Sequence, residues 1–196
     1  MELQQLPLFP LNTVLFPGGE LTLRIFETRY LDLVRDCGQQ GTGFGVCLIL
    51  EGEEVGAPAV PAVFGCEARV IDFSSGSDGL LVLCVRGERR FRVESTALRD
   101  NGLLVARVEW LDESPAQQIA PEHQLLALLL RRIVESAGPP HDRVDKSCFD
   151  DADWVSWRLA DWLPLSGVHR QLLLEQPDAL ARLQRLVELI PDFQSI

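Results

Sequence analysis

The stretch that decides the fold runs over residues 6–34 and reads LPLFPLNTVLFPGGELTLRIFETRYLDLV. Its first half is not expected to be helical, because three prolines favour extended or turn backbone there, namely Pro7, Pro10 and Pro17. Gly18 and Gly19 permit a turn, and apolar side chains then occupy every second position, at Leu21, Leu23 and Ile25. This alternation is typical of a strand with one buried face.

A helical period begins directly after this strand. Over residues 27–39 the apolar side chains recur at spacings of one, three and three, at Tyr30, Leu31, Val34 and Cys37. Such spacing lines one side of a helix, and Gly38 or Gly41 can end it. The sequence therefore predicts a single helix inserted among strands.

The rest of the first 115 residues reads mostly as strands. Alternating or continuous apolar runs lie at 45–50, 63–73, 80–85, 89–94 and 103–110. The third and fourth runs are predicted to form a hairpin that turns through Arg86, Gly87 and Glu88. Several short strands with turn residues between them are typical of a barrel or a sandwich.

Beyond Pro115 the apolar period becomes that of helices. Helices are predicted to begin at Pro121, near Asp150, near Ser166 and at Pro177. In the second of them Trp157 shares the face of Trp154, whereas Trp162 lies off that face. The sequence thus predicts an α+β protein, with a β-rich domain over residues 1–115 and a helical domain over 116–196.

Composition narrows the class of function. The chain of 196 residues has a formal net charge of −11. Both predicted domains are acidic, so neither offers a broad positive field that attracts phosphate. Its five cysteines are odd in number and mostly lie in apolar runs, as reduced thiols do. No export signal and no membrane-length apolar run is visible. We therefore expect a cytoplasmic protein that does not bind membranes.

The residues that catalysis or cofactor binding would need are missing from the sequence. Lys146 is the only lysine, and the residues before it contain no glycine of a phosphate-binding loop. Acidic neighbours favour the charged form of its amine, which suits neither a phosphate site nor a general base. The histidines are dispersed, and no spacing of histidine or cysteine suggests a metal site. The sequence predicts a protein that is not an enzyme and holds no metal or cofactor.

The segment 6–34 resembles the signature of the substrate-binding domain of Lon proteases. Later pieces fit in the same order, namely FGVCLIL, GCEARV, LLVLCVRGERRFRVES, ARVEWL and the stretch that starts VSWRLADWLPL. The resemblance covers nearly the whole chain. It implies a pseudo-barrel of the PUA-like kind followed by a helical bundle. It also implies recognition of protein segments, either apolar or unstructured peptides or one partner protein.

Two surfaces are candidates for binding. The first holds the aromatic side chains of the signature segment, Phe9, Phe16, Phe26 and Tyr30, together with the edge strands, where an extended peptide can add to a sheet. The alternative is RNA binding, since some PUA-like folds bind RNA and four arginines cluster at Arg86, Arg89, Arg90 and Arg92. Glu88 and Glu94 interrupt that cluster and favour an ion-paired strand face, so we expect protein rather than nucleic acid as the partner.

Overall fold

The computed structural model describes residues 3–112, 115–139 and 143–190. Two compact units make up the chain, Met1–Asp112 and Glu113–Ile196. The first unit contains six strands and one α-helix, and the second is helical. This mixed sheet with helices agrees with the expected α+β class. The domain boundary between residues 115 and 116 stays a prediction.

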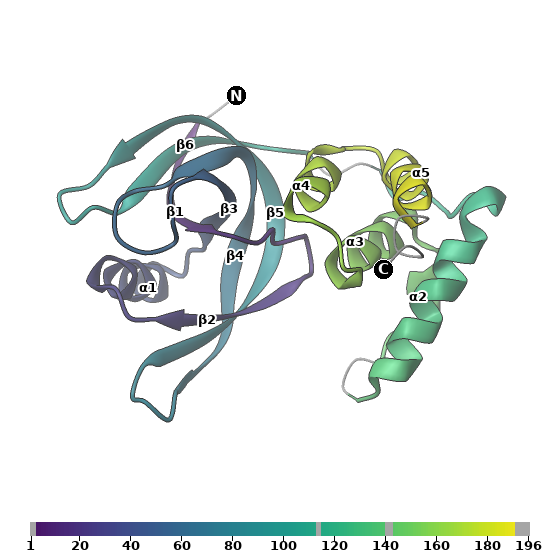
Figure 1. Cartoon of the computed structure of the whole chain (residues 1–196), viewed down its shortest axis with the longest axis horizontal. Coiled ribbons are helices and arrows are strands. Elements are labelled where there is room, and N and C mark those ends of the chain that lie inside the picture. Colours follow the sequence, from purple (N-terminus) through teal and green to yellow (C-terminus); the bar gives the residue numbers. More distant parts are fainter. Residues whose placement is uncertain (1–2, 113–114, 140–142, 191–196) are drawn as a thin grey trace. The chain divides into compact units, whose positions relative to one another are not determined.

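The first unit is a sheet that closes on itself (Figure 1). Its elements are β1 (Gln4–Leu11), β2 (Glu20–Ile25), α1 (Thr28–Gln40), β3 (Phe44–Glu51), β4 (Val60–Ser75), β5 (Leu81–Leu98) and β6 (Leu104–Trp110). The strand order is β2-β5-β4-β3-β1-β6, and an additional pairing of β5 with β6 joins five of the strands into a ring. β1 and β3 are parallel, and the other pairs are antiparallel. β2 lies outside the ring, paired with β5 alone.

The predicted hairpin at residues 86–88 is wrong, because β5 runs straight through them. The first part of β5 pairs with β2 and the later part with β6, and β4 pairs along both. The turn between β4 and β5 lies at residues 76–80, where the Gly76 N–H donates to the Leu80 carbonyl at 2.8 Å.

Gly87 has a different role from the one predicted. A Cβ atom at this position would lie 2.1 Å from the carbonyl oxygen of Phe16. The Gly87 N–H also donates to the Gly19 carbonyl at 2.8 Å. Glycine is needed here for the close approach of two chain segments.

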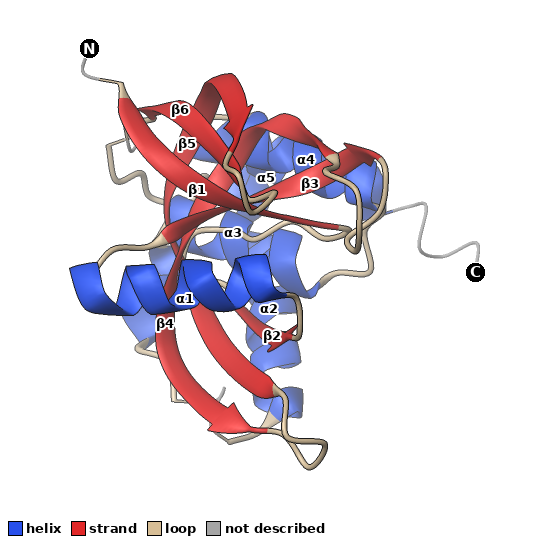
Figure 2. Ribbon diagram, turned by 90° about the vertical axis from the view of Figure 1, so that its left-hand side faces the viewer, coloured by secondary structure: helices blue, strands red, loops and turns tan. Residues whose placement is uncertain are grey.

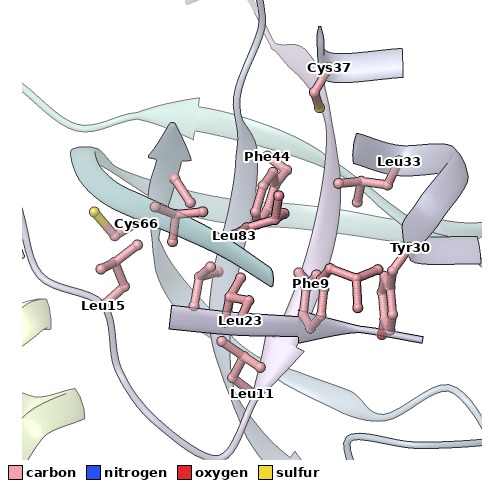
Figure 3. Packing of buried hydrophobic residues seen from close by; sticks show 14 of the residues in the cluster. Phe9, Leu11, Leu15, Leu23, Tyr30, Leu33, Cys37, Phe44, Cys66 and Leu83 are labelled. Atoms are coloured by element: carbon pink, nitrogen blue, oxygen red, sulfur yellow. The ribbon is translucent and has the colours of Figure 1, made fainter. Parts of the chain in front are cut away.

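The core of the first unit follows the predicted patterns. In β2, Leu23 and Ile25 are buried while Thr22 and Arg24 are exposed, which confirms the alternation. The predicted helix is α1, and its buried side chains Tyr30, Leu33 and Cys37 meet those of the strands (Figure 3). The predicted stripe is right at Tyr30 and Cys37 but wrong at Leu31, which is 41% exposed, because Leu33 takes the buried position instead. A second cluster around Phe91 and Val108 fills the ring where β5 and β6 pair.

The second unit contains the four predicted α-helices. Its elements are η1 (Pro121–His123), α2 (Gln124–Ala137), η2 (Lys146–Asp150), α3 (Ala152–Trp162), α4 (Gly167–Glu175) and α5 (Ala179–Leu189). Side chains cap three of the α-helices, since Asp151, Ser166 and Asp178 accept hydrogen bonds from backbone N–H groups of α3, α4 and α5. Of the helices in the described part of the chain, none is long and apolar enough to cross a membrane.

A buried arginine connects three parts of the second unit. Arg182 in α5 is 0% exposed. Its Nε donates to the Ser156 hydroxyl at 3.0 Å, and its Nη1 donates to the carbonyls of Gln176 and Pro177 at 2.9 and 3.0 Å. The guanidinium also pairs with Asp153 and lies 3.6 Å from the centre of the Trp157 ring. These contacts neutralise the buried charge and connect α3, α5 and the loop before α5.

Candidate polypeptide-binding site

A groove of ≈ 380 Å³ follows β2 and brings together three of the four aromatic candidates, Phe9, Phe26 and Tyr30. Residues 21–24 of β2 line it consecutively. Since successive side chains of a strand point to opposite faces, a groove lined by all four follows the strand's edge rather than one face. β2 is the last strand in the sheet order, and no strand within residues 3–112 pairs with its outer edge.

The aromatic side chains of this groove have different degrees of exposure. Phe9 and Tyr30 are buried and stack with ring centroids 3.9 Å apart and planes 16° apart (Figure 3). Burial raises the pKa of the Tyr30 hydroxyl, which keeps it neutral. Phe26 is 52% exposed, because it follows the inward-facing Ile25 at the end of β2 and so points the other way. The stacked pair forms part of the wall, and Phe26 supplies a ring that a ligand can reach.

Phe16 is not among the residues that line this groove. Its side chain is buried, and its carbonyl accepts a hydrogen bond from the Gly19 N–H at 2.9 Å. The structure therefore brings together three of the four aromatic candidates and places Phe16 at the turn before β2.

A larger apolar groove, of ≈ 630 Å³, lies between the last turns of α1 and the paired ends of β4 and β5. Figure 2 shows α1 and the projecting β4–β5 ribbon that border it. Three side chains of β4 in its lining are exposed, Val70, Ile71 and Phe73, the last by 72%. Sequence reasoning missed them, although a signal was present. Adjacent apolar residues such as Val70 and Ile71 face opposite sides of a strand, so one of them needs a second apolar surface.

The arginine cluster is an ion-paired strand. Arg86 pairs with Glu20 at 2.7 Å, and Arg89 pairs with Glu67 at 3.4 Å. Arg92 pairs with Glu94 at 2.6 Å and Glu109 at 2.9 Å, and Arg90 is buried. These four side chains present no open row of cations to a phosphate backbone.

The described residues offer neither a metal site nor a reactive thiol among Cys47 and Cys66. Within the described ranges no three His, Cys, Asp or Glu side chains are placed to hold a metal ion. Cys47 and Cys66 are fully buried, and burial raises the pKa of both thiols, so they stay protonated and unreactive.

Comparison with known proteins gives one consistent family. Residues 5–192 match the model of the ATP-dependent protease La (LON) substrate-binding domain. The chain is 25% identical over 195 residues to Lon protease 2 of Myxococcus xanthus, covering 95% of this chain but 23% of that protein, so it spans about a quarter of the relative's length.

Solved structures agree with this match. The Lon N-terminal domain protein from Xanthomonas campestris is 48% identical, with a TM-score of 0.80, over 94% of this chain and 98% of that one. The N-terminal domain of the Mycobacterium avium complex Lon protease shares the fold at 17% identity, with a TM-score of 0.69 over 96% and 99% of the two chains. This chain therefore belongs to the family of the Lon substrate-binding domain.

Proposed function

We propose that the chain binds exposed apolar segments of polypeptides, which lie extended along the free edge of β2. The observation that carries this proposal is the groove beside β2, with Phe26 exposed within it. An extended segment there can form backbone hydrogen bonds with β2, which are independent of its sequence. The apolar lining then selects for apolar side chains.

The charges around the groove favour basic segments over acidic ones. Glu27 and Glu54 line it together with a single cation, Arg24, in a chain of net charge −11. A cationic apolar segment is therefore attracted at encounter, and an acidic one is repelled. A few apolar side chains, after the costs of association, support a dissociation constant of about 10 µM to 1 mM.

Titration with a labelled apolar peptide tests the proposal. Phe26→Ala should weaken binding about threefold to tenfold, because it removes a ring that the ligand covers. The matched control is Leu125→Ala, which truncates a 77% exposed apolar side chain in α2. Equal affinities of Phe26→Ala and the wild type, or a larger loss in Leu125→Ala, would exclude this groove.

The salt dependence of binding separates the proposal from RNA binding. Capture of an apolar segment should change little between low and high salt, because it releases few counterions. Steep loss of affinity for an RNA oligonucleotide, without any peptide binding, would favour the arginines of β5 instead.

We also infer that binding occurs without turnover by these residues. The family match is to the substrate-binding domain, and the ATPase and protease modules of Lon lie outside it. Asp145 beside Lys146 accepts hydrogen bonds from the N–H and hydroxyl of Ser147 at 2.9 and 2.7 Å, as a helix cap does. We expect neither ATP hydrolysis nor casein cleavage, and activity lost in Lys146→Ala would contradict this.

A further inference from the structure

A third pocket of the first unit is polar and rich in arginine. It measures ≈ 320 Å³ and is lined by residues of β1, α1, β4, β5 and β6. Three arginines line it, Arg69, Arg89 and Arg99, against two carboxylates, Glu67 and Asp36. The charged lining is thus positive by one in a chain whose net charge is −11.

The guanidinium groups of this pocket have more donors than the two carboxylates use. The buried Glu67 pairs with Arg69 at 3.2 Å and Arg89 at 3.4 Å. Within the described residues, the Arg99 guanidinium has a single partner, Asp36, at 3.5 Å. Each guanidinium carries five N–H donors in a fixed plane. The Gly41 carbonyl accepts one of them, from Arg69 Nη1 at 2.8 Å, and several of the others remain for an anion that enters the pocket.

The pocket also has an aromatic wall. The Arg89 guanidinium lies 4.1 Å from the centre of the Trp110 ring, and the Trp110 Nε1 donates to the Gln4 side chain at 2.8 Å. This stacking holds one face of the Arg89 plane against the indole. The Nε and Nη2 groups at one edge of the plane donate to Glu67 at 3.4 Å, which leaves the Nη1 side for a further acceptor.

The pocket adjoins the larger apolar groove beside α1, and it shares no lining residue with the groove along β2. Cys37, Thr42 and Arg69 line both this pocket and the larger apolar groove beside α1. A ligand whose apolar side chains lie in that groove can therefore place an adjacent acidic group among the arginines.

We propose that this pocket binds one carboxylate of a polypeptide whose apolar side chains lie in the larger groove, either its C-terminal carboxylate or that of an acidic side chain that follows apolar residues. The inference rests on the proposed function, the capture of apolar segments, and extends it to this second groove. A lining with one excess positive charge suits a single carboxylate. A phosphate chain would bring further negative charges toward Glu67, Asp36 and the acidic surface of the protein.

The test uses one apolar pentapeptide, Leu-Phe-Leu-Phe-Leu, with either a free or an amidated C-terminus. The net charge of −11 alone predicts tighter binding of the amide. The pocket predicts the opposite preference, about fivefold to tenfold in favour of the free carboxylate. An amidated peptide that ends in Glu, compared with one that ends in Gln, shows whether a side chain serves as well as a terminus.

Substitutions of the lining arginines show whether they cause the preference for the free carboxylate. Arg99→Gln should bring the affinity for the free acid down to that for the amide, and Arg89→Lys should reduce it in part by removing the planar fork. Arg107→Gln, at an exposed arginine of β6 outside the pocket lining, is the matched control and should keep the preference.

Three results would overturn the carboxylate pocket. The first is equal or weaker binding of the free acid by the wild type. The second is a preference that survives in Arg99→Gln. The third is an RNA oligonucleotide that competes with the free acid and depends on Arg99. Binding of the amidated peptide that is lost in Phe26→Ala would still support the proposed function, so the two failures are distinguishable.

Discussion

The interiors of the two units differ in whether a charged side chain lies within the packed core. The first unit encloses apolar clusters, such as the one that contains Phe9, Leu33 and Phe44, and its buried charged side chains, Glu67 and Arg90, lie outside these clusters. The second unit buries a complete guanidinium, that of Arg182, among Asp153, Ser156 and Trp157. An apolar cluster tolerates substitutions that keep its volume, whereas a buried charge tolerates only partners that neutralise it.

The largest expected effect on stability comes from removing the buried charge of Arg182. Arg182→Met should lower the free energy of unfolding by about 3–5 kcal/mol, because it removes the guanidinium that pairs with Asp153 and donates to two backbone carbonyls. Denaturant unfolding followed by circular dichroism measures it. Arg185→Met, at an exposed arginine of the same helix, should change stability by less than about 0.5 kcal/mol. Equal effects of the two substitutions would show that Arg182 is not the anchor of this unit.

Two tryptophans of α3 differ in burial, and substituting each of them tests how much the surroundings of Arg182 contribute to stability. Trp157 is buried beneath the Arg182 guanidinium, whereas Trp162 is only partly buried. Trp157→Ala should cost about 3–5 kcal/mol, as for other buried aromatics, and Trp162→Ala should cost less. Denaturant melts of the two variants under one set of conditions check the order. Equal destabilisation would refute it.

Gly87→Ala probes the close approach in the first unit. The new Cβ would overlap the Phe16 carbonyl, so backbone must move and stability should fall by about 2–3 kcal/mol. Gly38→Ala is the control, since its Cβ would meet open space within α1. It should stabilise the protein by about 0.5–1 kcal/mol. A neutral Gly87→Ala in thermal melts would show that this contact is not needed.

The smallest expected effect on stability comes from removing the helix cap of α5. The Asp178 carboxylate accepts from the Ala181 N–H at 2.7 Å, and this hydrogen bond lowers the pKa of Asp178. The stabilisation, about 1 kcal/mol, is therefore complete above the ordinary pKa of aspartate and is lost as pH falls through the lowered value. Asp178→Ala should differ from the wild type by this amount at neutral pH and by little in strong acid. A difference that does not change with pH would contradict the cap.

The sequence predicted most elements of the fold, because periodicity reports burial. The alternation in β2 is a clear example, whereas the stripe of α1 was right at Tyr30 and Cys37 and wrong at the exposed Leu31. The length of β5 could not be predicted, since Gly87 between charged residues looks like a turn until the neighbouring chain is known. Arg182 could not be predicted either. It occupies a core position of α5, between Ala179 and Leu186, where a pattern expects an apolar residue.

The candidate site was predictable only where it is local in sequence. Phe26 and Tyr30 flank the start of one helix, so the signature segment contains both. Val70 and Phe73 belong to an ordinary apolar strand, and only the fold shows that they border a groove. The arginine pocket draws residues from five strands and helices far apart in the chain, and no spacing rule connects them.

The central claim is that polypeptide segments bind along β2, and one measurement tests it most directly. The amidated apolar peptide is titrated into isotopically labelled protein while the backbone amide resonances are recorded. The account predicts that the largest shifts fall at residues 21–30, including Phe26 and Tyr30, and in the strands around the groove. Shifts confined to the second unit or to Arg86, Arg89 and Arg92 would contradict it.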